Sequence, residues 1–188
     1  MFEAEPTGCG SARLVVPAEN LMKDYLDFCR ASWGKVHDSY ILDNPDRYDE
    51  WRHTRIRDYL RAEQGIGLPP GIVPSVTFWI FQSGCMIGIC NFRPVLNERL
   101  ERYGGHLGFV LRPECRGRGY GRSLIPLLLE RARQLGIREL LLTCEAANTA
   151  SVRWSEAFPG SQSEYGVEFF DGRPCRIHRT WVKLRESA

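Results

Sequence analysis

The chain has 188 residues, of which 43% are hydrophobic and 26% charged, and a formal net charge of +2 at pH 7. These values predict one folded domain over residues 1–188, exclude a disordered or fibrous chain, and argue against nucleic acid as a partner. The apolar runs are shorter than the roughly 18 residues of a membrane span and the acidic N-terminus lacks the apolar region of a signal peptide, so we expect a cytoplasmic protein that does not bind membranes.

The N-terminal part predicts one strand and two helices. Residues 12–17 have the apolar character of a strand. Residues 19–33 carry apolar side chains at helical spacing. Residues 44–65 predict a second helix, with Pro45 at its start and Gly65 at its end. A proline-rich loop follows.

The middle of the chain predicts a hairpin, a short helix and a strand. Two β-rich runs flank Ser83 and Gly84, a pair typical of a tight hairpin turn. Residues 96–104 can form a short helix. Residues 104–113 read as a strand that ends at Pro113.

The next predicted helix runs from about Gly121 to Gly136 and contains a proline. Pro126 has no N–H to donate to the carbonyl group of Arg122. We therefore expect a kink or a loosened first turn in this helix. Regular, unbent geometry through Pro126 would contradict that expectation.

The remaining elements complete a mixed α/β pattern. Residues 137–146 predict a buried strand and residues 148–158 a short helix. Two further β-rich runs flank Asp171 and Gly172, which indicates a second hairpin. The order predicts a mixed sheet in which one strand–helix–strand unit makes a parallel crossover.

The loop at residues 116–122 holds three glycines and three arginines at the start of a predicted helix. Backbone N–H groups at such a position are unpaired and attract anions, above all phosphate. Glycine lets the backbone approach a ligand closely, and arginine adds charge and paired hydrogen bonds. The loop therefore indicates a phosphate site. The alternative is a glycine-rich loop that only turns the chain.

Two named phosphate motifs are excluded, because neither G-x-x-x-x-G-K-[ST] nor G-x-G-x-x-G is present in this loop. The run Arg116-Gly117-Arg118-Gly119-Tyr120-Gly121 instead fits R/Q-x-x-G-x-G/A, and "LLLTCEAANTASVRWSEAF" follows it. In both stretches the chain resembles the GNAT superfamily, the Gcn5-related N-acetyltransferases. The resemblance implies the α/β GNAT acyl-CoA N-acyltransferase fold, with a mixed central sheet of about six to seven strands flanked by helices.

The resemblance also implies acetyl-CoA as the cofactor and a set of residues that hold it. The pantetheine arm would pair with the strand edge at Phe109, Val110 and Leu111. The pyrophosphate would lie in the loop, on Arg116, Gly117, Arg118, Gly119, Tyr120 and Gly121, with Arg122 and Ser123 beside it. Asn148 and Ser151 belong to the following helix motif and would face the cofactor. Trp154 either flanks the arm or is an ordinary core residue.

The chemistry of amide formation requires a base, an oxyanion donor and an acid. His106 and Glu145 are both candidates for the base. A backbone N–H of Val110 or Leu111 is the family-like oxyanion donor. Many relatives carry a Tyr as the acid where this chain has Ser155. Tyr103 or Tyr165 could replace it, or the thiolate could leave unaided.

The acceptor is expected to be a primary amine of a small molecule or peptide, acetylated by direct transfer in a ternary complex. We expect its site on the first two helices and the late hairpin, which are rich in aromatic and charged residues: Trp33, Tyr40, Tyr48, Trp51, Arg52, Tyr165 and Glu168. Transfer of a longer acyl chain or to a protein amine is a second reading. A CoA-binding sensor or scaffold with little catalysis is a third.

The cysteine pattern predicts neither disulfides nor a metal site. Seven cysteines with no C-x-x-C and no zinc-ligand spacing predict free thiols and no metal site. Cys115 lies inside the loop and is the thiol whose acylation would contradict direct transfer. The final hairpin could pair across a homodimer interface, although no residue requires it.

Overall fold

A computed structural model describes residues 11–35 and 42–184. Its seven strands are β1 (Arg13–Val15), β2 (Val76–Gln82), β3 (Cys85–Phe92), β4 (Leu107–Leu111), β5 (Glu139–Glu145), β6 (Gln162–Phe170) and β7 (Arg173–Lys183). Its α-helices are α1 (Met22–Ser32), α2 (Tyr48–Trp51), α3 (Arg55–Gln64), α4 (Glu98–Arg102), α5 (Tyr120–Ser123), α6 (Ile125–Gln134) and α7 (Thr149–Ser155). Short 3-10 turns are at Glu19–Leu21, Pro45–Arg47 and Pro113–Cys115.

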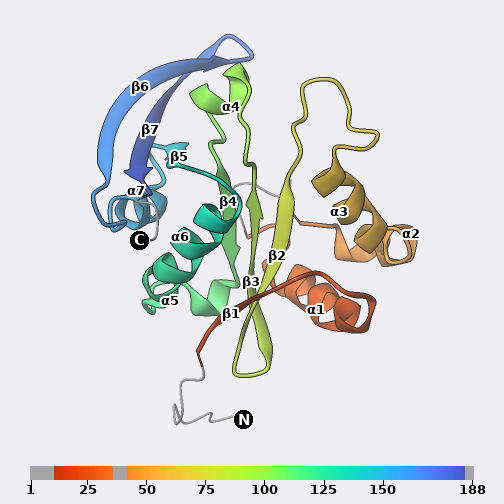
Figure 1. Cartoon of the computed structure of the whole chain (residues 1–188). Helices are drawn as coiled ribbons and strands as arrows, with labels where there is room; N and C mark the ends of the chain where they lie inside the picture. Colours follow the sequence, from red (N-terminus) through yellow and green to blue (C-terminus); the bar gives the residue numbers. More distant parts are fainter. Residues whose placement is uncertain (1–10, 36–41, 185–188) are drawn as a thin grey trace.

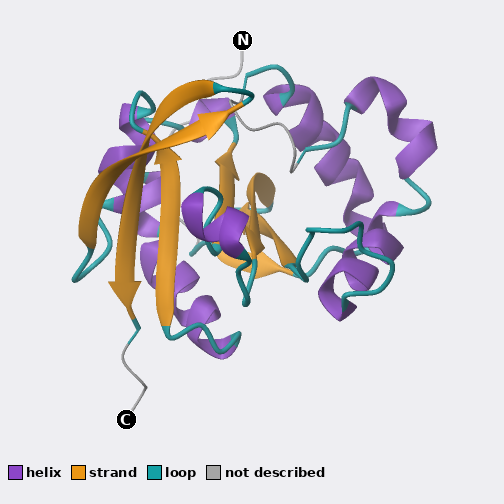
Figure 2. Ribbon diagram, turned by 90° about the horizontal axis from the view of Figure 1, so that it is seen from above, coloured by secondary structure: helices purple, strands orange, loops and turns teal. Residues whose placement is uncertain are grey.

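The strands form two antiparallel sheets (Figures 1 and 2). One has the order β1-β2-β3-β4 and the other the order β5-β7-β6. The expected crossover connects β4 through α5 and α6 to β5, and it therefore links the two sheets. The predicted α/β GNAT fold with about six to seven strands is confirmed, with its strands divided between two antiparallel sheets.

Alternation along β2 builds a core on each side of the first sheet. Phe78 and Ile80 face the cluster that includes α6, whereas Trp79 and Phe81 face the cluster that includes α1. This is the period-2 pattern of a strand buried on both faces. Helices α1 to α3 accordingly lie on one side of the sheet and α5 to α7 on the other, as Figure 1 shows.

Both predicted hairpins are present. Ser83 and Gly84 have φ values of 50° and 81°, and Asp171 and Gly172 have 49° and 75°. Two successive positive φ values define the turn that matches the twist of a two-residue hairpin. Gly65 ends α3 with φ 70°, as its position in the sequence predicted.

Two predicted helices are interrupted. The segment 44–65 forms α2 and α3 with turns between Trp51 and Arg55, so the prediction of one continuous helix was wrong. The prediction for Pro126 is confirmed. The helical segment breaks at Leu124, which separates α5 from α6 and leaves Pro126 in the first turn of α6, where no N–H is needed.

Candidate active site

The two sheets are joined at one end of β4 and separate from there. The backbone N–H of His106 donates to the carbonyl oxygen of Leu141 at 2.8 Å, and the N–H of Leu141 donates to Nδ1 of the His106 ring at 2.9 Å. Close by, the N–H of Gly104 donates to Oγ1 of Thr143 at 2.7 Å. A cleft of about 100 Å³ lies between β4 and β5 and extends to α7.

Strand β4 presents an open edge to this cleft. The N–H of Arg112 donates to the oxygen of Ile87 and that of Arg93 to the oxygen of His106, both at 2.8 Å. In an antiparallel pair, every second residue hydrogen-bonds to the neighbouring strand. The backbone N–H and C=O of Val110 therefore bond to β3, whereas those of Phe109 and Leu111 point away from β3. Of the two oxyanion donors expected from the sequence, Leu111 has the N–H on the open edge.

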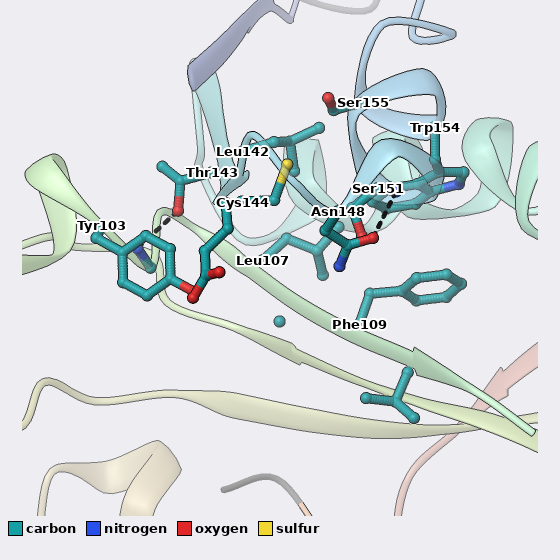
Figure 3. Close-up of a pocket in the computed structure, with 14 residues that line it drawn as sticks. Tyr103, Leu107, Phe109, Leu142, Thr143, Cys144, Asn148, Ser151, Trp154 and Ser155 are labelled. Carbon is teal, nitrogen blue, oxygen red and sulfur yellow. Dashed lines mark hydrogen bonds between the residues drawn. The ribbon is translucent and has the colours of Figure 1, made fainter. Parts of the chain in front are cut away.

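The cleft brings together many of the residues that the sequence singled out (Figure 3). Its lining includes Tyr103, Phe109, Val110, Glu145, Asn148, Ser151, Trp154 and Ser155. The Asn148 side chain accepts a hydrogen bond of 3.2 Å from the N–H of Ser151 and thereby caps α7. Leu111 and the loop residues lie beyond the lining, where the chain leaves β4.

Trp154 forms the wall between the cleft and the glycine-arginine loop. Its ring stacks on that of Phe109, with 4.6 Å between centroids and 5° between planes. Its indole N–H donates to the carbonyl oxygen of Gly121 at 2.8 Å. A Cβ atom on Gly121 would lie 3.2 Å from the indole, which accounts for glycine at this position.

The loop has the backbone of an anion cradle. Gly117 and Gly119 have φ values of +69° and +83°, and no atom lies within 4 Å of where a Cβ would be. In the described part of the chain, the N–H groups of residues 117–119 donate no hydrogen bond. The N–H groups of the first turn of α5 follow directly. These open donors fit a pyrophosphate group.

The three arginines of the loop divide into two kinds. Arg116 turns back onto the protein: its Nε donates to the oxygen of Leu111 at 3.0 Å and its guanidinium to the oxygen of Lys35 at 2.8 Å. Burial lowers its pKa. Arg118 and Arg122 are exposed, and neither forms an ion pair within residues 11–35 and 42–184. They can therefore contact phosphate, whereas Arg116 fixes the loop. Ser123 donates to the oxygen of Tyr120 at 2.8 Å and closes the turn.

His106 lies at the junction of the two sheets, outside the lining of the cleft. Burial, together with the positive charge of Arg93, lowers its pKa to about 4. Because Nδ1 accepts the N–H of Leu141, the neutral ring carries its proton on Nε2. The ring has no lone pair to offer a substrate, which argues against His106 as the base and for a structural role.

Glu145 and Tyr103 both line the cleft. Glu145 is the last residue of β5, and Tyr103 follows directly after α4. The Tyr103 ring packs edge-on against Phe170, with centroids 5.2 Å apart. A carboxylate and a phenol on the same cleft can take and give a proton during the reaction.

Ser155 stands where many relatives carry Tyr, and it belongs to a buried polar cluster. Its hydroxyl donates to the oxygen of Val152 at 2.9 Å and accepts from Thr180 at 3.0 Å. Nδ1 of His178, which is fully buried, lies 3.4 Å from the Ser155 oxygen. Nε2 of His178 lies 3.2 Å from a carboxylate oxygen of Glu156. The Ser155 proton is thus held by a backbone carbonyl.

A larger cavity of about 650 Å³ adjoins the cleft and was not predicted. It lies among α3, the loop at residues 69–75, β2, β3 and α4. Of the residues expected to form the acceptor site, those that the structure describes do not line it: Trp51, for example, is buried in the core and Tyr165 is exposed on β6. Tyr40 lies outside the described residues. The lining combines apolar side chains, such as Leu42, Ile72 and Ile89, with polar ones, of which Thr77 and Asn91 are hydrogen-bonded at 2.9 Å.

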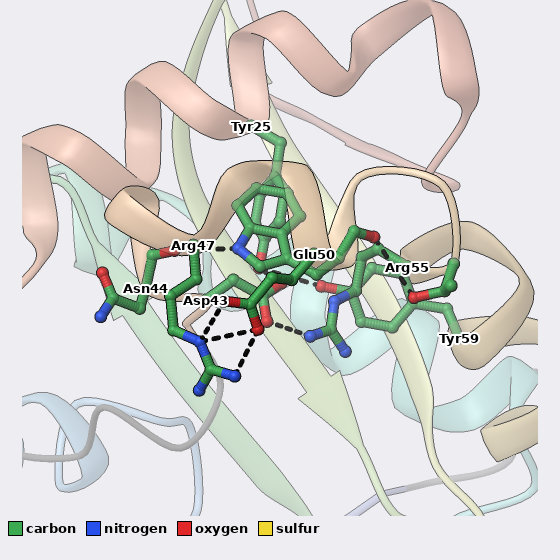
Figure 4. A network of polar contacts seen from close by, with 9 residues as sticks. Tyr25, Asp43, Asn44, Arg47, Glu50, Arg55 and Tyr59 are labelled. Carbon is green, nitrogen blue, oxygen red and sulfur yellow. Dashed lines mark hydrogen bonds and ion pairs between the residues drawn. The ribbon is translucent and has the colours of Figure 1, made fainter.

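One wall of this cavity rests on the polar network in Figure 4. The Asp43 carboxylate accepts a hydrogen bond of 2.9 Å from the Tyr25 hydroxyl and forms an ion pair with Arg55. The Tyr59 hydroxyl donates to the Tyr25 oxygen at 3.2 Å. Burial raises the pKa of both tyrosines, so they stay neutral hydrogen-bond donors. The network binds α3 to α1 and fixes the shape of the cavity.

Comparison with known proteins gives the family. The model of the acetyltransferase (GNAT) family matches residues 33–158. The chain belongs to this family and is by class an acetyl-CoA-dependent N-acetyltransferase that acts on amines. No curated protein sequence matches it. No described helix has the length and apolarity to cross a membrane.

Several solved structures share the fold. RimL, a ribosomal-protein alpha-N-acetyltransferase in complex with coenzyme A, is 15% identical with a TM-score of 0.64 over 93% of this chain and 94% of its own. The microcin C7 self-immunity acetyltransferase MccE, in complex with acetyl-CoA and AMP, is 13% identical with a TM-score of 0.64 over 93% of each chain. A spermidine N-acetyltransferase chimera of Vibrio cholerae SpeG and hSSAT is 16% identical with a TM-score of 0.59 over 93% and 96%.

Proposed function

We propose that this protein moves the acetyl group of acetyl-CoA to a primary amine of a small molecule or peptide, by direct transfer in a ternary complex in the cytoplasm. One observation carries the proposal. The open edge of β4 faces a cleft, and the residues Tyr103 and Gly104 at its end also line the larger cavity. Donor and acceptor can therefore meet at this junction without an acyl-enzyme.

The cofactor would lie along β4 and end in the loop. The carbonyl oxygen of Phe109 and the N–H of Leu111 would pair with the pantetheine amides as an added strand does. The N–H groups of residues 117–121, with Arg118 and Arg122, would bind the pyrophosphate. Trp154 would separate these two parts.

When bound, acetyl-CoA supplies the acetyl group as a thioester, and the new amide bond forms as the carbon–sulfur bond breaks and sulfur leaves with the electron pair. Glu145 is proposed to take the proton of the amine, directly or through water. The N–H of Phe109, which is on the open edge and lines the cleft, is proposed to donate to the carbonyl oxygen as negative charge develops there, because Leu111 lies beside the loop that would hold the pyrophosphate. Tyr103 is proposed to give a proton to the leaving sulfur, since the Ser155 proton is held by Val152.

The test compares thermal stability with and without acetyl-CoA in wild type, Gly119→Asp and Gly136→Asp. Both glycines have positive φ, at +83° and +77°, and open space around them, so both variants suffer similar backbone strain. Only Gly119 lies in the cradle. A ligand at a hundredfold excess over its Kd stabilises the fold by about 2.7 kcal/mol. We expect that gain in wild type and Gly136→Asp and its loss in Gly119→Asp.

A panel of amines then separates the enzyme from a CoA-binding module. Product formation with any amine, at a rate that depends on Glu145, supports the transferase. Stabilisation by acetyl-CoA without an acetylated product across the panel would favour the sensor or scaffold. An unchanged stability in wild type would contradict both readings.

A further inference from the structure

The larger cavity presents its ligand to the reacting centre from one end. Tyr103 and Gly104 line both the cavity and the cleft. An acceptor in the cavity therefore has its amine at Tyr103 and the rest of its structure among α3, β2, β3 and α4. The side chains of those elements that line the cavity contact the acceptor, so the charges on these side chains indicate which class of amine binds.

Five charged side chains line the cavity, and three of them are already engaged. Asp43 and Arg55 form an ion pair. Arg93 is buried and donates to the oxygens of Gly104 and Gly105 at 3.0 and 2.9 Å.

The other two are Asp58 on α3 and Arg99 on α4. Among the residues that the structure describes, neither side chain has a hydrogen bond or an ion pair. One negative and one positive group thus remain for a ligand.

Arg99 lies close to the place where the amine must react. It precedes Tyr103 by one helical turn, and the N–H of Tyr103 donates to the oxygen of Arg99 at 2.9 Å. Tyr103 is the extended residue directly after α4, and both side chains line the same cavity. An anion bound by Arg99 therefore lies in the same cavity as an amine at Tyr103.

Asp58 belongs to a different wall. Asp58 is on α3. The opposite wall is α4 and the loop at Gly71, which the Asn97 side chain joins by a hydrogen bond of 2.9 Å to the Gly71 oxygen. A ligand that fills the cavity thus meets a guanidinium beside the amine and a carboxylate on α3. An amine with no anionic group would leave Arg99 without a counterion in the complex.

We propose that the acceptor is an α-amino acid whose side chain carries a hydrogen-bond donor or a positive charge. Its carboxylate pairs with Arg99, its α-amine reacts beside Tyr103, and its side chain meets Asp58. Guanidinium groups bind carboxylates through two parallel hydrogen bonds, which fixes the direction of the amine. This inference rests on the proposed function and names the substrate class of the same site.

The test measures initial rates with acetyl-CoA and the twenty α-amino acids, each paired with its α-carboxamide, which keeps the amine and the side chain. For the best substrate we expect kcat/KM to favour the acid by about tenfold, since a carboxylate forms charge-assisted hydrogen bonds with a guanidinium that a carboxamide does not. Arg99→Gln should bring this ratio close to one. Arg102→Gln is the matched control, because Arg102 is on the same helix, pairs with Glu98 and does not line the cavity.

Equal rates for acids and amides in wild type, or a preference that survives Arg99→Gln, would overturn the proposal. Asp58→Asn should reduce the preference for basic or donor-bearing side chains at least severalfold. If no pair yields product, calorimetric titration of the same acids and amides into protein saturated with CoA decides the point: an Arg99-dependent preference for acids supports it, and its absence overturns it. Failure of the proposed function is recognised separately, by the absence of stabilisation by acetyl-CoA.

Discussion

The indole N–H of Trp154 donates a hydrogen bond of 2.8 Å to the carbonyl oxygen of Gly121. The bond joins α7, on the far side of the cleft, to the start of α5, where the cradle ends. It also occupies a carbonyl group at the break between α5 and α6, where Pro126 has disturbed the helical pattern. The position of the cradle relative to β4 therefore depends on a residue 33 positions further along the chain.

Replacing Trp154 with Phe should distinguish the contribution of this hydrogen bond from that of the ring stacking on Phe109. Phe keeps an aromatic ring against Phe109 but leaves the Gly121 carbonyl without its donor. We expect a loss of about 1 kcal/mol in the free energy of unfolding and an acetyl-CoA Kd several times higher. Chemical denaturation and calorimetry measure the two effects. Trp181→Phe, the same change on β7, should leave the Kd at the wild-type value; an equal rise there would contradict the specific role of Trp154.

Glu145→Gln tests the proposed base. Loss of a positioned base reduces the rate by about 10² to 10⁴. We expect a fall of that size in kcat with little change in the Kd of acetyl-CoA. Glu139→Gln, at the exposed start of the same strand, should keep wild-type turnover. A Glu145→Gln enzyme with full activity at neutral pH would exclude Glu145 as the base and would mean that water or another group takes the proton.

His106 predicts a pH dependence of stability. Its pKa is about 4 in the fold and about 6.5 in the unfolded chain, so the unfolded state binds more protons between these values. The stability that the neutral ring contributes is present above pH 6.5 and is lost as the pH falls toward 4. Because the ring is partly exposed, we expect a loss of only about 1–2 kcal/mol.

The comparison of wild type with His106→Asn isolates this effect, because Asn can accept the Leu141 N–H but does not titrate. The difference in unfolding free energy between the two proteins should change between pH 7.5 and 4.5 in favour of the variant. Parallel curves over this range would show that the pKa of His106 is not lowered. Turnover should also persist in His106→Asn, since Glu145 is the proposed base.

Local features of the fold could be read from the sequence, and features made by distant contacts could not. Ser83-Gly84 and Asp171-Gly172 fix their turns through their own φ values, so both hairpins were predictable. Pro126 acts within its own helix in the same way. The break between α2 and α3 has no such signal. The Trp51 side chain there enters the core and its indole donates to the oxygen of Asn44 at 2.8 Å, a contact that depends on the rest of the fold.

In the candidate site, too, local features could be predicted from the sequence and features made by distant contacts could not. The turn of the glycine-arginine loop could be predicted, because Gly117, Gly119 and Gly121 lie close together in the sequence. The function of Arg116 as a brace and of His106 as a link between sheets depends on Leu111, Lys35 and Leu141, to which no sequence spacing points. The larger cavity was not predicted for the same reason, since α3, β3 and α4 enclose it only in the folded protein.

Cys115 provides the last test of direct transfer. It lies between Glu114 and Arg116 at the entry to the cradle, and burial and the neighbouring carboxylate raise its pKa. A thiol must lose its proton to attack a thioester, so a raised pKa makes Cys115 a poor nucleophile at neutral pH. We expect Cys115→Ser to keep wild-type kcat and intact-protein mass spectrometry after mixing with acetyl-CoA to show no acetyl adduct on Cys115. The exposed Cys85 serves as the control for slow chemical acylation. An adduct on Cys115 that forms and decays at the rate of turnover would replace direct transfer by an acyl-enzyme.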